Sequence, residues 1–187
     1  MLVRAYRNGA SIDMTGTVTI PFIDVPSGSW YYNYVAYAYN QGYLAGLHNV
    51  TPVSFRPGDA ITRAEFVEMA ERFMGVAPSG YIGTKYSDVL AGHWASGAIA
   101  YATNQGWITG YPNGKFGPED SLTRAQLVTI VNNMLGRVPN RASIDANMAG
   151  LNIFTDVGRN YWAYYHILEA ANAHYCNMNG GVETWTR

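Results

Sequence analysis

Charged side chains are scarce in this chain of 187 residues, where they make up 13% of the total, about half the usual fraction. The formal net charge is −1. A chain with so little charge offers no basic surface that would attract a phosphate backbone or an anionic membrane. We therefore expect no nucleic-acid partner.

Cysteine occurs once, at Cys176, which excludes an intrachain disulfide. A single cysteine fits a cytosolic protein and equally a surface protein that uses no disulfides. No run approaches the ~20 apolar residues needed to span a bilayer, so we expect no membrane insertion. We also expect no signal peptide in this chain, because Arg4 and Arg7 interrupt its start and no apolar run follows.

The residue patterns of catalytic and metal sites are missing as well. The carboxylates are scattered, and the four histidines do not cluster at ligand spacing. His166 and His174 are eight residues apart, too far to share a metal in the usual i, i+4 manner. We expect a protein that is not an enzyme, with no metal and no cofactor.

Aromatic residues, in contrast, are abundant at 14%, with 15 Tyr and 5 Trp. Rings with a polar tip suit carbohydrate or protein surfaces, although many pack in cores. Three segments share the pattern aromatic-x-Asp-Val, and a Trp follows the aromatic by eight residues in each. The segments start at Phe22, Tyr86 and Phe154, and the tryptophans are Trp30, Trp94 and Trp162. The pattern indicates an internal repeat.

Each Trp opens a stretch whose apolar residues recur at i, i+1, i+4, i+5 and i+8, which predicts one face of a helix. Gly42 and Gly106 end the first two helices. We expect the tryptophans to pack in the core or between repeats rather than against sugars. The aspartates Asp24, Asp88 and Asp156 precede the helices, and we expect them to accept hydrogen bonds from nearby backbone N–H groups.

A second helix follows in two of the repeats, after a Gly-rich loop. Thr62 with Glu65, and Thr123 with Gln126, have the Thr-x-x-Glu/Gln spacing of a capping box. Apolar residues follow each box at identical spacings. We therefore expect the two helices to have equivalent apolar faces and to pack against each other through them. Residues 9–20 and 137–153 are interpreted as connectors.

The chain divides on this basis into four segments. Residues 1–21 are an N-terminal segment, either the tail of a bundle helix or a disordered leader. Residues 22–85 and 86–153 are the first and second repeats. Residues 154–187 are a partial third repeat with a C-terminal tail, since no third Thr-Arg-Ala motif occurs.

These motifs resemble the S-layer homology (SLH) repeat. The marks are aromatic-x-Asp-Val, the Trp helix, the loop Gly-Tyr-Pro-Asn-Gly-Lys-Phe-x-Pro at 110–118, and Leu-Thr-Arg-Ala-Gln at 122–126. The resemblance implies an all-α fold of helix-loop-helix repeats in a pseudo-threefold arrangement, with a central helical bundle and outlying prong helices. The first repeat departs from the pattern in its loop, and the third lacks Thr-Arg-Ala.

The family further implies that grooves in the domain bind secondary cell-wall polysaccharide, often carrying a pyruvate ketal. Arg63 and Arg124 carry this hypothesis, because capping gives no reason for a cation at the first position of a helix. Two interpretations stay open for them: an ion pair with an Asp of a neighbouring repeat, or a clamp for a sugar carboxylate. The other candidate glycan-binding residues lie in the loops, where aromatic side chains on a rigid scaffold are ligand candidates because little packing would be lost if they faced solvent: Tyr43, Gly46, Trp107, Gly110, Tyr111 and Asn113.

The favoured function is a non-catalytic module that anchors a protein to anionic, in some cases pyruvylated, cell-wall polysaccharide on a bacterial surface. The alternative is a protein–protein adaptor or structural assembly subunit, which would use degenerate repeats and bind another protein or its own copies. A glycan-processing enzyme would need paired carboxylates in a cleft, which the sequence does not offer.

Overall fold

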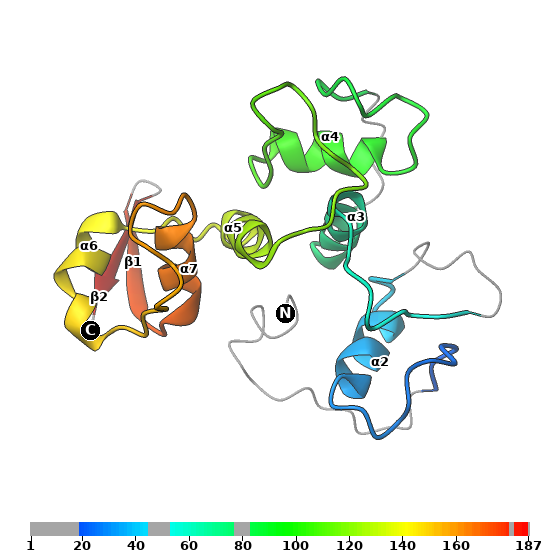
Figure 1. Ribbon diagram of the computed structural model, residues 1–187, viewed down its shortest axis with the longest axis horizontal. Coiled ribbons are helices and arrows are strands. Elements are labelled where there is room, and N and C mark those ends of the chain that lie inside the picture. Colours follow the sequence, from blue (N-terminus) through cyan, green and yellow to red (C-terminus); the bar gives the residue numbers. More distant parts are fainter. Residues whose placement is uncertain (1–18, 45–52, 77–82, 180–181, 187) are drawn as a thin grey trace. The chain divides into compact units, whose positions relative to one another are not determined.

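The computed structural model describes residues 19–44, 53–76, 83–179 and 182–186 (Figure 1). The chain forms two compact units. The first contains Met1–Ala102 and Gly110–Ser121, and the second contains Thr103–Thr109 and Leu122–Arg187.

The helices of the first unit begin and end close to where the sequence pattern predicts. They are α2 (Tyr32–Asn40), α3 (Arg63–Phe73) and most of α4 (Ser96–Asn104). Gly42 and Gly106 follow α2 and α4 with φ of 76° and 72°, the left-handed conformation that ends a helix. The predicted helix stops are therefore confirmed.

Both capping boxes are also confirmed. The Thr62 hydroxyl accepts from the Glu65 N–H at the start of α3, and the Glu65 carboxylate accepts from the Thr62 N–H at 2.8 Å. Thr123 and Gln126 make the same pair of bonds at the start of α5 (Arg124–Met134). Four N–H groups at a helix start lack intrahelical acceptors, and the boxes satisfy one of them while tying down the residue before the helix.

The first repeat has its own apolar cluster around α2. Its buried members are Phe22, Val25, Val35 and Leu44. The side chain of Phe22 contacts Tyr39 edge-on, with 5.5 Å between ring centroids, and lies 5.6 Å from Phe55. These contacts hold the start of the first repeat and its loop against one helix.

The second unit contains α5, α6 (Arg141–Ala146), the 3₁₀ helix η1 (Met148–Gly150) and α7 (Tyr164–Ala171). It ends in two antiparallel strands, β1 (Tyr175–Asn179) and β2 (Val182–Thr186), that pair from Tyr175 with Thr186 to Asn179 with Val182. α7 packs against α5 and α6, and β2 packs against α6 (Figure 1).

The interpretation of residues 137–153 as a connector is wrong, because α6 and η1 lie there. Asn140 caps α6, with its side-chain oxygen accepting from the Ser143 N–H at 2.9 Å. Ile144 is fully buried in a cluster with Tyr164 and Leu168 of α7. A six-residue helix is too short to show a helical period, so only its packing reveals it.

The C-terminal hairpin is an element that the sequence did not predict. The Trp185 Nε1–H donates to Glu169 Oε2 at 3.0 Å, and the Trp185 ring stacks on His174 at 4.0 Å. His174 Nε2 lies 2.9 Å from the other oxygen of Glu169, which is fully buried in α7. In the third repeat, α7 is thus followed by this hairpin.

Helices are the main regular secondary structure of the described residues, which confirms the all-α class with this hairpin as an addition. The pseudo-threefold arrangement and the boundaries of the four segments stay predictions. None of the described helices combines the length and hydrophobicity that crossing a bilayer requires.

Candidate functional site

The loop of the second repeat, residues 110–121, is fastened by Asp88. One oxygen of its carboxylate accepts from the Phe116 N–H at 2.8 Å, and the other accepts from the Gly117 N–H at 2.8 Å. Burial disfavours the charged form, but the backbone donors outweigh it and lower the pKa of Asp88. The carboxylate therefore stays ionised and holds the loop at neutral pH.

Asp24 does the same in the first repeat, where it accepts from the Phe55 N–H at 2.8 Å and the Arg56 N–H at 2.7 Å. The aspartates were expected to bind backbone N–H groups close in sequence, and that range is wrong, because their partners lie 28 to 32 residues further along. Asp156 of the third repeat is exposed.

The start of α3 contacts the loop that Asp88 holds. The Arg63 N–H donates to the Asp120 carbonyl at 3.0 Å, and the Ala64 N–H donates to the Pro118 carbonyl at 3.0 Å. The loop carbonyls thus satisfy two of the N–H groups that a helix start leaves without an acceptor. We call this contact of 62–64 with 116–121 the occupied joint.

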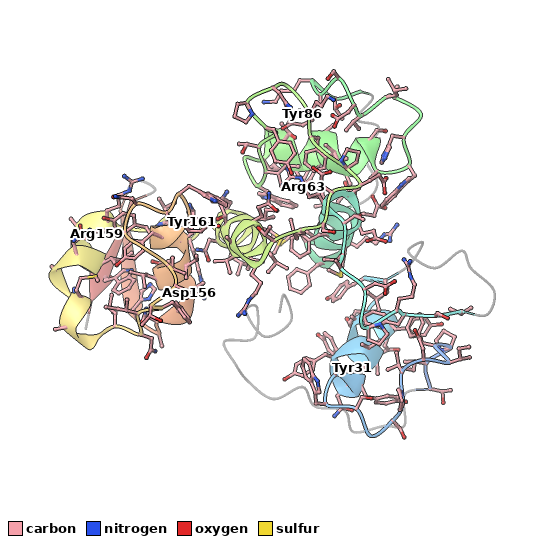
Figure 2. All side chains as sticks on the ribbon, in the orientation of Figure 1. Tyr31, Arg63, Tyr86, Asp156, Arg159 and Tyr161 are labelled. Atoms are coloured by element: carbon pink, nitrogen blue, oxygen red, sulfur yellow. The ribbon has the colours of Figure 1, made fainter. Side chains whose placement is uncertain are left out.

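The Arg63 side chain lies inside the occupied joint and is 5% exposed (Figure 2). Its Nε–H donates to the Phe116 carbonyl at 2.8 Å. Its guanidinium carbon lies 4.5 Å from the Phe116 ring centroid and 4.9 Å from that of Tyr111. Burial lowers the pKa of Arg63, while Tyr111 and Asp120 oppose the change. An arginine keeps its charge under these conditions, so it supplies a fixed cation that stacks on two rings.

Arg124 has the same position in α5 and a different environment. Its side chain is exposed, and it makes no ion pair or ring contact within the described part of the chain. The two arginines that the sequence presents as equivalent therefore differ: Arg63 is enclosed and Arg124 is open to solvent.

The remaining loop candidates also differ in exposure. Asn113 is exposed, and its side-chain oxygen accepts from the Lys115 N–H at 3.1 Å. Tyr111 is half-buried and donates its hydroxyl to Asp120 at 3.0 Å. A Cβ at Gly110 would collide with the Tyr86 ring, so glycine is required there by close packing.

Trp107 is 6% exposed, so its side chain packs within the protein rather than facing solvent. Its carbonyl accepts from the Asn133 side chain at 3.2 Å. Tyr43 is half-buried, with its ring 5.1 Å from Phe73. Gly46 lies outside the described residues.

The three repeat tryptophans are exposed, which overturns the expectation that they are core or inter-repeat residues. Trp30 is 82% exposed, Trp94 is 54% exposed and Trp162 is 58% exposed. Each of them precedes its helix by two residues, so the helical period that would direct it to the buried face does not extend to it.

Trp94 lies beside the loop of the second repeat through His93. Its ring stacks on the His93 ring at 5.6 Å, and His93 Nε2 is 3.6 Å from the Glu119 carboxylate. Held in this way, the Trp94 side chain remains 54% exposed. The sequence contained the signal, a Trp at a fixed repeat position, but periodicity alone assigned it to the core.

Among the described residues, no group of three or more His, Cys, Asp or Glu side chains is placed to hold a metal ion. The buried Glu169 contacts Trp185 and His174 of the hairpin and has a structural role. What the exposed residues offer is a binding surface of aromatic rings, backbone amides and an arginine.

The first two repeats match a known protein family. The model of the S-layer homology domain matches residues 21–67 and 85–128. The cellulosome-anchoring protein of Acetivibrio thermocellus is 34% identical over 161 residues, which cover 83% of this chain and 33% of that protein. Cell surface glycoprotein 1 of the same organism is 30% identical over 163 residues, 82% of this chain and 7% of the glycoprotein.

The S-layer protein EA1 of Bacillus anthracis is 43% identical over 60 residues, which cover 32% of this chain and 7% of that protein. The chain thus spans a third or less of the length of these relatives.

Proposed function

Because the chain belongs to the S-layer homology domain family, we propose that it is a non-catalytic module that attaches a protein to the wall of a bacterial cell. The names of its relatives, a cellulosome-anchoring protein and S-layer proteins among them, support a cell-surface location. Its ligand is a wall polysaccharide that carries acidic groups.

The exposure of Trp30, Trp94 and Trp162 carries this proposal. Large apolar rings exposed to solvent indicate an interaction site when they do not occur singly. Here they recur at the same position of each repeat. A pyranose ring has an apolar face that stacks on indole. Recurrence on successive repeats would let one polymer chain bind several weak sites with high overall avidity.

The acidic groups of the polymer bind, in this proposal, at the start of α5. Arg124 is exposed there beside the N–H groups of a helix start, an arrangement that favours a carboxylate. Tyr111, Asn113 and Gly110 of the second loop, and Tyr43 and Gly46 of the first, contribute contacts to sugar. Arg63 acts as a fixed cation beneath Tyr111 rather than as an open clamp.

The test is co-sedimentation with purified wall polymer, with and without its acidic groups. The triple variant Trp30→Ala, Trp94→Ala, Trp162→Ala should stay folded, because all three rings are exposed, and should lose binding to both polymers. Arg124→Ala should weaken binding to the acidic polymer about tenfold and leave binding to the other unchanged.

Val138→Ala is the matched control, since it removes apolar surface that is 51% exposed and lies outside the repeat position of the tryptophans. If the triple variant sediments as the wild type does, the tryptophans are not the binding surface. If Arg124→Ala weakens binding to both polymers equally, Arg124 does not bind the acidic groups of the polymer.

The second candidate is a protein–protein adaptor. The hairpin after α7 favours it, because the first two repeats have no strand after the corresponding helix in the described residues. If the wild type binds a purified wall polymer and the triple Trp variant does not, the anchoring function is favoured over the adaptor function.

A further inference from the structure

Two arginines of the second unit meet at one tyrosine. The guanidinium carbon of Arg141, at the start of α6, lies 5.0 Å from the ring centroid of Tyr165 on α7. Arg159, on the loop before α7, hydrogen-bonds Tyr165 and Asp145, and these bonds raise its pKa. Both arginines are therefore permanent cations beside the same tyrosine.

Tyr165 is a fixed platform for these cations. Its ring packs against the buried cluster of Ile144, Tyr164 and Leu168. Its hydroxyl donates to the Asp145 carboxylate at 3.2 Å, which ties α7 to α6. A residue held by packing and by a hydrogen bond keeps the groups that contact it in place.

The charges at this platform do not balance. Asp145 forms an ion pair with Arg159, whereas Arg141 forms none in the described part of the chain, although it is one turn from Asp145 on α6. Two guanidinium groups and one carboxylate leave one excess positive charge. Arg141 is exposed and the Arg159 side chain is 58% exposed, so this charge is open to solvent.

Exposed aromatic rings lie on the same loop as Arg159 (Figure 2). Tyr161 is 43% exposed and Trp162 is 58% exposed, and their ring centroids are 5.9 Å apart. The Tyr161 N–H donates to the Gly158 carbonyl at 2.9 Å, which closes a turn in the loop. An acidic sugar has an apolar face and a carboxylate, and this loop offers an aromatic ring and a guanidinium within a few positions of each other.

Arg159 distinguishes the third repeat from the first two. It precedes Trp162 by three positions, where the other repeats have Ser27 and Ala91 before their tryptophans. The third repeat also lacks the Thr-Arg-Ala motif that gives each of the others an arginine. The ion pair with Asp145 accounts for Arg159 as a brace of the loop, but it does not account for a second cation on the same tyrosine.

We infer that Arg141 and Arg159 bind the carboxylate of an acidic sugar whose apolar face stacks on Trp162. The choice of a sugar rests on the proposed function, whereas the excess charge and the exposed ring are properties of the second unit itself. Two guanidinium forks can each donate to a carboxylate oxygen, and the ring of Tyr165 keeps the fork of Arg141 in place. The site uses α6 and the loop before α7, and it is additional to the start of α5, where Arg124 is proposed to act.

Titration of the full chain with methyl glucuronide tests this site, and methyl glucoside is the neutral counterpart of this probe. NMR spectroscopy follows the indole N–H signals, and the Trp162 signal is identified by its absence in Trp162→Phe. In the wild type the glucuronide should shift the Trp162 signal with an affinity about tenfold to a hundredfold higher than that of the glucoside.

Substitution of the two cations tests their role. Arg141→Gln and Arg159→Gln should each weaken glucuronide binding at Trp162 about fivefold and should leave glucoside binding unchanged. Lys85→Gln is the matched control, because Lys85 Nζ also lies over a tyrosine ring, that of Tyr86, at 5.5 Å in the first unit. It should bind the glucuronide like the wild type.

Asp145→Asn separates a binding role of Arg159 from a bracing role. The substitution removes the ion pair and one negative charge, and asparagine keeps an oxygen for the Tyr165 hydroxyl. If Arg159 binds the carboxylate, Asp145→Asn should bind the glucuronide at least as tightly as the wild type. If Arg159 only braces the loop, Asp145→Asn should weaken binding as Arg159→Gln does, and the inference is then wrong.

The site and the proposed function can fail separately. A Trp162 signal that does not respond to the glucuronide, or responds equally to both probes, would overturn the site even if the protein co-sediments with wall polymer. Unchanged glucuronide binding in both arginine variants would overturn it as well. A wild type that binds the glucuronide at Trp162 but binds no wall polymer would contradict the proposed function and support the site.

Discussion

Gly117 shows how one residue fixes the loop of the occupied joint. It has φ of 68°, in the left-handed region, and its N–H donates to Asp88. A Cβ there would collide with the Asp120 carboxylate and would lie 2.7 Å from the Tyr111 ring. The residue therefore combines a conformational requirement with a steric one.

We predict that Gly117→Ala lowers the free energy of unfolding by about 2–3 kcal/mol, from the left-handed backbone plus the displaced neighbours. Gly114→Ala is the matched control, because Gly114 has φ of 78° and no atom within 4 Å of its Cβ position. It should cost only the backbone part, about 1 kcal/mol. Urea unfolding of both variants measures the difference, and equal losses would show that the predicted collision is relieved.

The two arginines of the repeated motif have different environments. Arg63 and Arg124 have the same motif, the same cap and the same helical position, yet one is enclosed by a loop and the other is exposed. Neither of the sequence interpretations, an ion pair with a repeat aspartate or an open carboxylate clamp, includes the backbone carbonyl that Arg63 contacts.

At the scale of elements, the C-terminal hairpin depends on its contact with α7. Glu169 is fully buried, and its carboxylate accepts from the Trp185 Nε1–H at 3.0 Å. A buried carboxylate oxygen that loses its donor keeps its desolvation cost with nothing to offset it. The indole N–H is thus a point where the hairpin and the helix stabilise each other.

We predict that Trp185→Phe lowers the free energy of unfolding by about 1–3 kcal/mol, because phenylalanine keeps a ring against His174 but has no N–H for Glu169. Trp162→Phe makes the same change at a ring that is 58% exposed, and it should be close to neutral. Equilibrium unfolding in urea measures both. Equal stability of the two variants would show that the Trp185–Glu169 bond contributes nothing measurable.

At the scale of the whole molecule, stability should depend on pH through His166. Burial lowers the pKa of His166, and the positive charge of Arg141 lowers it further. In the unfolded chain the imidazole has its ordinary pKa of ~6.5. The unfolded state therefore binds the proton more readily, and stability is full above ~6.5 and falls as the pH drops below that value.

We predict that the free energy of unfolding of the wild type decreases between about pH 7 and about pH 5, and that His166→Gln decreases less steeply. The hydrogen bond from the Asn132 side chain to the backbone carbonyl of residue 166, at 2.9 Å, is available in both proteins. Identical slopes would contradict the role of His166.

The sequence by itself determined what depends on neighbours along the chain. The repeat, the family and the two capping boxes all rest on residues within a few positions of one another. Gly42 and Gly106 end helices for the same local reason, because only a left-handed residue closes a helix in that way.

Only the tertiary structure decided what depends on contacts distant in sequence. Arg63 is buried because a loop some fifty residues further along the chain covers it, whereas the Arg124 side chain is exposed. Trp107 is enclosed, and the repeat tryptophans precede their helices and face solvent. Burial follows from which segments meet, and a periodic pattern specifies a face without specifying what will cover it.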